Sequence, residues 1–233
     1  FFARGRRPTG SRDPFALRRA ALHMIQIIVG NRLRLPLRPV FAHALAALPP
    51  GDGPAAADAD ELVAFLVDRL KVQQREAGVR HDLIDAVAGD GREDDLVRLL
   101  DRVAALGAFL ATEDGANLLA GYGRAANILR IEEEREGRSF AGAVDRALLL
   151  APAEVALADA LASAQPAAEA ALAAEDFTGA MRALAALRQA VDLFFADVTV
   201  NADDEGVRAN RLALLAMLRD TANRVADFSG IGC

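Results

Sequence analysis

Three expected helices carry basic and amide side chains of the kinds that bind RNA. A guanidinium group contacts phosphate or stacks on a base, and an amide can read the edge of an unpaired base. We therefore predict RNA-binding roles for three sets of residues: Arg69, Lys71 and Arg75; Arg124, Asn127 and Arg130; and Arg208, Asn210 and Arg211. The alternative for the arginines is pairing with neighbouring Glu and Asp residues of their own helices.

Tyr122 completes the predicted RNA-binding residues. It is the only tyrosine, one turn before Ala126, and its ring could stack on an unpaired base. The alternative is that the ring packs in the core with its hydroxyl group at the rim.

The third basic set lies in a predicted helical hairpin, Val191–Arg219. Two amphipathic segments flank a polar turn in which Asn201, Asp203 and Asp204 are suited to cap the second helix. Arg208 therefore falls near the start of a helix, where the helix dipole does not favour a cation. This position indicates selection for something other than helix stability.

The chain offers little for metal binding or nucleophilic catalysis. The dipeptide His81-Asp82 is typical of metal phosphohydrolases, but such a site needs further histidines and another aspartate. Only His23 and His43 remain, and no nucleophile, base and orienting group can be assembled from them and the terminal Cys233. We therefore expect no catalytic residue and no metal site, with Asp82 serving as a helix cap.

Composition predicts an all-helical protein. Of the 233 residues 53% are apolar, mostly Ala and Leu, with few β-branched runs and almost no period-two alternation. Charged residues interrupt every apolar run, and one cysteine permits no disulfide framework. We expect a cytoplasmic protein without a membrane partner. Because the first residue is Phe1, we also expect a piece of a longer polypeptide.

Charge is unevenly distributed along the chain. The formal net charge is −6, yet nine arginines lie in the first forty residues, where Asp13 is the only acid. These arginines are Arg4, Arg6, Arg7, Arg12, Arg18, Arg19, Arg32, Arg34 and Arg38. A solvated face is the alternative reading of any such cluster.

Turn and cap residues divide the chain into predicted helices, with Asp13, Asp58, Thr112 and Asp176 among the expected caps. Their approximate ranges are 14–29, 40–48, 61–77, 82–88, 93–110, 113–136, 152–173, 177–187, 191–198 and 205–225. The stretch Pro49–Pro54 breaks the chain and leads into no Gly-Lys pair, so it predicts a linker and no phosphate-binding loop. We accordingly predict one domain over 1–50, a linker over 51–58 and a second domain over 59–233.

Four long strings give the chain a resemblance to a known family. They resemble the C-terminal part of the bacterial glycyl-tRNA synthetase β subunit and read RPTGSRDPFALRRAAL, FLVDRLKVQQREAGVRHDLIDAV, DGANLLAGYGRAANILRIEE and VDLFFADVTVNADDEGVRANRLALL. In that family the first string ends a helical domain related to metal phosphohydrolases but without their metal ligands. The remainder is similar to the class I synthetase type of helical anticodon-binding bundle, shared with arginyl-tRNA synthetase.

The resemblance implies a function. The chain would be a non-catalytic part of glycine–tRNA ligase that recognises the anticodon arm of glycine tRNA during ATP-dependent aminoacylation. The implied partners are glycine tRNA and a separate α subunit in an α2β2 assembly, with neither a membrane nor DNA. No cofactor is expected in this segment, because ATP and Mg²⁺ belong to the α subunit. The anticodon surface would combine the 122–130 helix with the 208–211 helix start.

Two departures and two alternatives accompany the resemblance. Gly123 stands where the family leads us to expect Lys, which removes a phosphate contact, and Ala190 where we expect Pro. The first alternative is a protein–protein docking module for the α subunit or a second β subunit, to which the apolar helices of 153–187 are suited. The second is a residual phosphohydrolase, which would hold a divalent metal.

Overall fold

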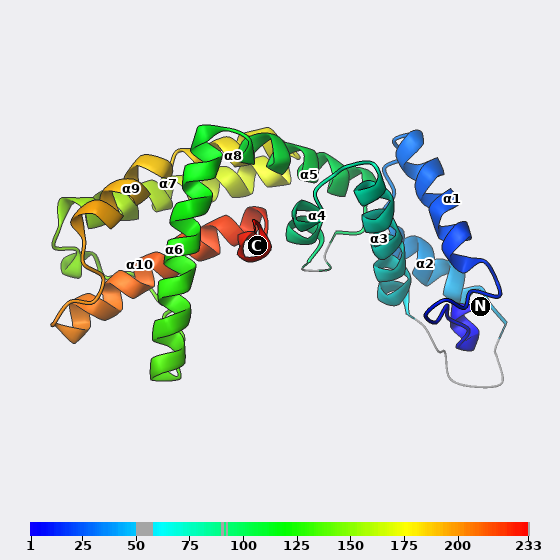
Figure 1. Cartoon of the computed structure of the whole chain (residues 1–233), viewed down its shortest axis with the longest axis horizontal. Coiled ribbons are helices and arrows are strands. Elements are labelled where there is room, and N and C mark those ends of the chain that lie inside the picture. The colour runs from blue at the N-terminus through cyan, green and yellow to red at the C-terminus, as the bar shows by residue number, and fades with distance from the viewer. Residues whose placement is uncertain (50–57, 90, 92, 233) are drawn as a thin grey trace. The chain divides into compact units, whose positions relative to one another are not determined.

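The computed structural model describes residues 1–49, 58–89, 91 and 93–232. Within these residues every regular element is a helix, which confirms the predicted all-α class (Figure 1). The α-helices are α1 (Leu17–Gly30), α2 (Leu37–Ala46), α3 (Ala59–Glu76), α4 (His81–Ala88), α5 (Leu96–Leu110), α6 (Glu113–Glu136), α7 (Pro152–Ala173), α8 (Phe177–Ala185), α9 (Arg188–Asp197) and α10 (Glu205–Val225). Short 3-10 helices are η1 (Phe2–Arg4), η2 (Arg146–Leu148) and η3 (Phe228–Gly230).

Polar side chains begin four of these helices as predicted. Each accepts a hydrogen bond of 2.8 to 3.1 Å from the backbone N–H three residues further on, which satisfies an orphan amide of the first turn. These caps are Asp58, Thr112, Asp176 and Asp204. Asp13 also caps a helix, but α1 begins at Leu17 rather than at Pro14. The Asp13 carboxylate accepts from the N–H groups of Leu17 and Arg18, at 2.8 and 2.9 Å, which fixes the later start.

The chain divides into two compact units, Phe1–Val103 and Ala104–Cys233, which meet within α5. We predicted the division at 51–58 instead. The helix that follows this segment, α3, packs on both α1 and α2 and so belongs to the first unit. Residues 51–57 of the predicted linker lie outside the described residues.

In the first unit, α1, α2 and α4 pack on α3. Ile25 of α1 and Leu70 of α3 are fully buried there. Asp95, itself almost buried, caps α5 through the N–H groups of Val97 and Arg98 and accepts a 2.6 Å hydrogen bond from Arg34 Nε. The start of α5 is thereby tied to the segment between α1 and α2.

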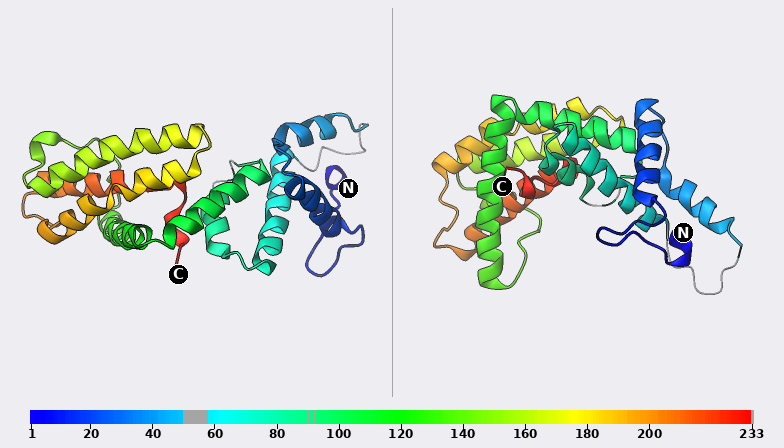
Figure 2. Two further views of the ribbon diagram at one scale, coloured as in Figure 1. Left: turned by 90° about the horizontal axis from the view of Figure 1, so that it is seen from above. Right: turned by 45° about the vertical axis from the view of Figure 1, so that its right-hand side comes forward.

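In the second unit, α7 packs against α8, α9 and α10, and α6 packs against α9 and α10. The views in Figures 1 and 2 show α6 crossing α9 and α10 steeply instead of running along them. Leu157 of α7, Phe194 of α9 and Leu214 of α10 are fully buried in this unit. One side of α6 is thus covered by α8, α9, α10 and η3, and its opposite side remains exposed.

A glycine allows α6 and α9 to approach closely. A Cβ atom at Gly121 would lie 2.6 Å from Val191 Cγ1, well inside van der Waals contact. Two residues along the same helix, Gly123 is exposed and a Cβ atom there would meet nothing within 4 Å. Of these two glycines, only Gly121 must lack a side chain for packing.

This contrast predicts opposite effects of two matched substitutions. Gly121→Ala should lower the free energy of unfolding by about 1–3 kcal/mol, because it overpacks the α6–α9 contact. Gly123→Ala should leave it unchanged or raise it by up to about 1 kcal/mol, because Ala favours the helix over Gly. Urea unfolding of both variants measures the difference, and equal midpoints would contradict the packing role of Gly121.

Candidate nucleic-acid interface

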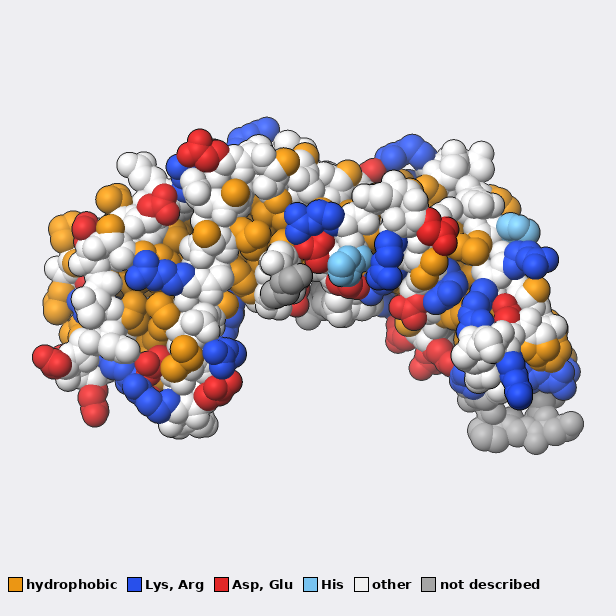
Figure 3. Space-filling view, viewed as in Figure 1, with side chains coloured by type: hydrophobic (Ala, Val, Ile, Leu, Met, Phe, Trp, Pro, Cys, Tyr) orange, Lys and Arg blue, Asp and Glu red, His pale blue; other side chains and the backbone are white. Residues whose placement is uncertain are grey.

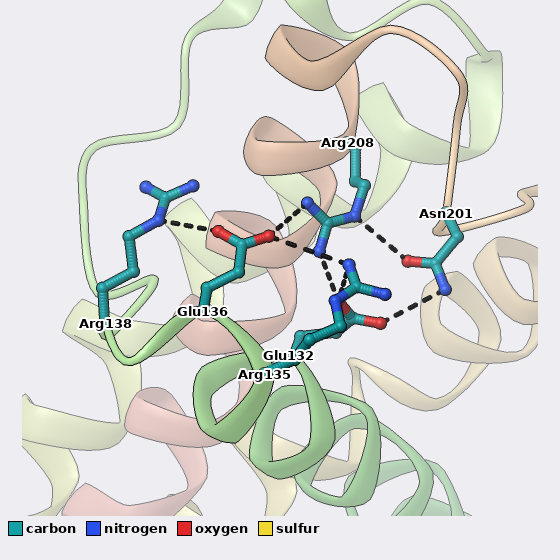
Figure 4. Close-up of polar contacts among 6 residues, drawn as sticks. All are labelled: Glu132, Arg135, Glu136, Arg138, Asn201 and Arg208. Atoms are coloured by element: carbon teal, nitrogen blue, oxygen red, sulfur yellow. Dashed lines mark hydrogen bonds and ion pairs between the residues drawn. The ribbon is translucent and has the colours of Figure 1, made fainter.

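Arg208, at the start of α10, is held inside a network of charges at the C-terminal end of α6 (Figure 4). Its guanidinium group donates to Glu132, and to Glu136 at 2.6 Å, and its side chain is only 12% exposed. Asn201 contacts both Arg208 and Glu132. Burial and these partners assign Arg208 to joining α10 with α6, which corrects its predicted position on an RNA-facing surface.

Arg211, one turn further along α10, is likewise turned inward. It pairs with Glu154 of α7, whose side chain is fully buried, and donates from Nη1 to the Thr199 carbonyl at 2.8 Å. Burial alone would raise the pKa of Glu154. The hydrogen bonds that its carboxylate accepts from Arg211 and from the Ala151 N–H outweigh this effect, so the pKa is lowered. The prediction that Arg211 offers its guanidinium group to RNA is wrong for this buried geometry.

Asn210 and Tyr122 are also structural. The Asn210 amide accepts from the Asp145 N–H at 2.8 Å and donates to the Asp145 carbonyl at 2.9 Å, so both ends are used internally. The Tyr122 ring is 2% exposed and lies 5.5 Å from the Phe228 ring, and its hydroxyl group donates to Asn223 at 2.9 Å. Burial raises the pKa of Tyr122. Neither residue presents the base-reading or stacking surface predicted for it.

The first predicted set lies on α3, in the other unit. Lys71 pairs with Asp85 of α4 at 2.6 Å, and Arg75 is exposed. Arg69 Nε is buried with no hydrogen-bond partner among the described residues. Arg75 thus lies on the exposed surface of the first unit, Arg69 and Lys71 are partly buried there, and the second predicted set lies on α6.

Arg124, Asn127 and Arg130 lie on the exposed side of α6. The Arg124 guanidinium group lies 4.4 Å from the centre of the Phe195 ring of α9. Arg130 donates to Asn127 and, at 3.0 Å, to the exposed Glu134. Exposed pairs of this kind contribute little to stability, so their arginines can exchange a carboxylate for another anion at low cost.

Sequence reasoning missed four residues of this surface, one of which is Phe195 of α9. Arg135 and Arg138 are each 56% exposed, and Ile131 is 46% exposed between them and Arg124. The signal was present, because residues 124, 131 and 135 recur on one side of a helix. We call the whole set the α6 face; it comprises Arg124, Asn127, Arg130, Ile131, Arg135, Arg138 and Phe195.

The α6 face carries excess positive charge where the ion-pair network of Figure 4 reaches the surface. Three guanidinium groups, of Arg135, Arg138 and Arg208, share the carboxylates of Glu132 and Glu136. Hydrogen bonds from Arg208 and Arg138 lower the pKa of Glu136. Figure 3 shows Arg side chains, in blue, beside hydrophobic and acidic ones on this side of the second unit. Exposed guanidinium groups beside an aromatic ring are suited to phosphate binding and base stacking.

The described residues contain no group of three or more His, Cys, Asp or Glu side chains that could hold a metal ion. In that same part of the chain, no helix is both long and apolar enough to cross a membrane.

Comparisons with known proteins bear on both units. The family described as Glycyl-tRNA synthetase beta subunit matches residues 1–89, and the DALR anticodon binding domain matches residues 118–232. Over 99% of its length the chain is similar to proteins named glycine–tRNA ligase beta subunit, with 58% identity in Rhodospirillum centenum, 50% in Phenylobacterium zucineum and 46% in Ruegeria sp.. It spans about a third, 32%, of the length of each relative. The first match crosses the predicted linker, in agreement with the packing of α3 on α1 and α2.

The pairing of Arg211 with Glu154 predicts a specific acid sensitivity. Because the folded-state pKa of Glu154 is lowered, its stabilising contribution is complete above its unfolded pKa of about 4.3 and is lost as the pH falls through the folded-state pKa. Glu154→Gln should lower the free energy of unfolding at pH 7 by about 1–3 kcal/mol and reduce its decline below about pH 5. Urea midpoints between pH 7 and pH 3 measure both effects.

A matched control is Glu169→Gln, which removes an exposed pair with Arg224. Its midpoints should follow those of the unaltered chain. Parallel pH profiles for Glu154→Gln and the unaltered chain would contradict the proposed linkage.

Proposed function

The chain belongs to the glycyl-tRNA synthetase β-subunit family, and we propose that its second unit binds the anticodon arm of glycine tRNA. The observation that carries this proposal is the α6 face, which lies within the residues that match an anticodon-binding domain. On this surface the exposed Arg130, Arg135 and Arg138 accompany Arg124, which lies over the Phe195 ring.

The two ends of the α6 face have different parts in the proposed complex. Arg130, Arg135 and Arg138 bind phosphate groups, because each guanidinium group is more than half exposed even while it pairs with a glutamate of α6. Arg124 lies over the Phe195 ring, and its exposed side is proposed to contact an unpaired base of the loop. Asn127, exposed one turn along α6, supplies a carboxamide group for a base edge.

The remaining steps of aminoacylation are proposed for other parts of the enzyme. The chain would act as a non-catalytic part of a cytoplasmic glycine–tRNA ligase with an α2β2 assembly. Glycine would be activated with ATP and Mg²⁺ by the α subunit. The described residues of this chain would only hold and orient the RNA.

A docking function has separate support in the second unit. An apolar groove runs between α5 and α8 and is lined by Ala105, Ala108, Phe109 and Met181. None of these side chains belongs to the α6 face, so a protein partner such as the α subunit could bind without competing for RNA. Ala108→Glu, which places a charge in the groove, should abolish α-subunit binding and leave tRNA binding unchanged if this second function holds.

The RNA-binding proposal predicts a salt-dependent loss. In Arg135→Gln/Arg138→Gln, affinity for glycine tRNA should fall by roughly tenfold at low salt. The slope of log K against log salt should become shallower by about 1.4, since each phosphate contact to a single strand contributes about 0.7. The fold should survive, because Arg208 still pairs with Glu132 and Glu136. Fluorescence anisotropy from 50 to 300 mM salt is the measurement.

The control is Arg182→Gln, which removes an exposed arginine of α8 outside the α6 face. In the assembled enzyme, the double variant should lower aminoacylation and leave tRNA-independent glycine activation unchanged. Identical salt slopes for the double variant and the Arg182→Gln control would refute the proposed interface.

A further inference from the structure

The arginines of the first forty residues fall into two groups according to their ion-pair partners. Arg32, Arg34 and Arg38 are neutralised within the first unit by Asp101, Asp95 and Asp60, at 2.7, 2.6 and 2.5 Å. Their role is structural, because each links a residue near α1 or α2 to an acid of α3 or α5. Arg32, Arg34 and Arg38, the later part of this basic run, therefore stabilise the fold of the first unit.

The earlier part of the run is not neutralised in this way. Among the described residues no carboxylate lies within ion-pair distance of four exposed arginines, namely Arg4, Arg6, Arg12 and Arg19. The acid of this stretch, Asp13, is occupied in capping α1. We call residues 1–19 the N-terminal hook. Its exposed guanidinium groups form a concentration of positive charge on a chain of net charge −6.

The hook has a defined conformation. Arg7 Nη2 donates to Glu61 of α3 at 2.6 Å, and the Phe2 ring lies 5.0 Å from the Phe65 ring. Backbone hydrogen bonds of 2.8 and 3.0 Å join Thr9 and Arg12 across a tight turn. The exposed arginines are therefore carried on a backbone that is attached to α3, which lowers the entropic cost of binding a partner.

Aromatic rings alternate with the cations of the hook. The Phe1 and Phe15 rings stack at 4.5 Å, and the Arg6 guanidinium group lies 5.3 Å from the Phe15 ring centre. Both rings are exposed, at 59% and 38%. Basic side chains interleaved with aromatic faces are typical of surfaces that follow a nucleic-acid backbone and stack on its bases.

We propose that the N-terminal hook is a second RNA-binding surface, which contacts the sugar-phosphate backbone without reading sequence. Arginine suits this role, because its planar fork binds phosphate oxygens in pairs. A membrane surface fits the hook less well. Its exposed rings are stacked on each other and beneath Arg6, and they form no apolar helix face that could enter a lipid layer. The hook lies in the first unit and is separate from the α6 face.

The experiment compares chains of the same length that differ only at the hook. In Arg4→Gln/Arg6→Gln/Arg12→Gln/Arg19→Gln, the slope of log K against log salt for glycine tRNA should become shallower by about 3, from four contacts at about 0.7–0.9 each. A glycine tRNA with a scrambled anticodon loop should lose the same increment, because the contacts read no sequence. Arg182→Gln is the control, and circular dichroism with thermal unfolding verifies the fold.

Hydroxyl-radical footprinting then separates the two surfaces. Hook and α6-face variants should expose different nucleotides of the bound tRNA. The proposal is overturned if the hook variant keeps the salt slope and footprint of the unaltered chain, whatever the α6-face variants do. It is also overturned if the hook variant binds tRNA normally but loses sedimentation with vesicles of one-third phosphatidylserine, since the partner would then be an anionic membrane.

Discussion

The second unit depends on two buried carboxylates that must keep their arginine partners. Glu132 of α6 is 3% exposed and Glu154 of α7 is fully buried. Removing the partner of such a group costs about 3–5 kcal/mol, because an uncompensated charge would remain in the interior. Arg208 and Arg211 stand one turn apart at the start of α10 and meet these two acids. The two pairs therefore fix the position of α10 against α6 and α7 together.

This arrangement also determines what the surface presents. Because Arg208 satisfies Glu132 and Glu136 from the inside, Arg135 and Arg138 need not be buried to do so. They remain at the rim, with the excess charge of the network. The close approach of α9 at Gly121 places Phe195 under Arg124 on the same side of α6. The helices that form the buried ion pairs thus also carry the exposed residues that we propose contact RNA.

The sequence was sufficient where structure is decided locally. The caps Asp58, Thr112 and Asp204 bond to amides three residues away, so residue type and spacing predict them. The start of α1 shows the limit, because Asp13 is a cap but bonds to residues four and five positions on. Helix existence was predictable along the chain, and the exact first residue depended on which amides a carboxylate reached.

The candidate site could be predicted only in part, because sequence shows the donors without their distant partners. Arg208 and Arg211 are separated from Glu132 and Glu154 by 76 and 57 residues, and nothing in their own helix indicates burial. The unfavourable position of a cation near a helix start did indicate a role beyond helix stability, but that role is pairing with an internal carboxylate. Exposure of Arg124 was inferable from its helical face, whereas its contact with Phe195 required the crossing of α6 and α9.

The shared carboxylates at the rim have a consequence for ligand choice under the proposed role. A small anion, such as a free nucleotide, gains little there, because it must displace a glutamate that already occupies each guanidinium group. A polymer displaces several glutamates at once, and after the first exchange each further one is intramolecular. Because of these acids, the affinity of the surface should increase with the number of phosphates joined in one molecule. Abundant mononucleotides in the cell would therefore leave the surface free.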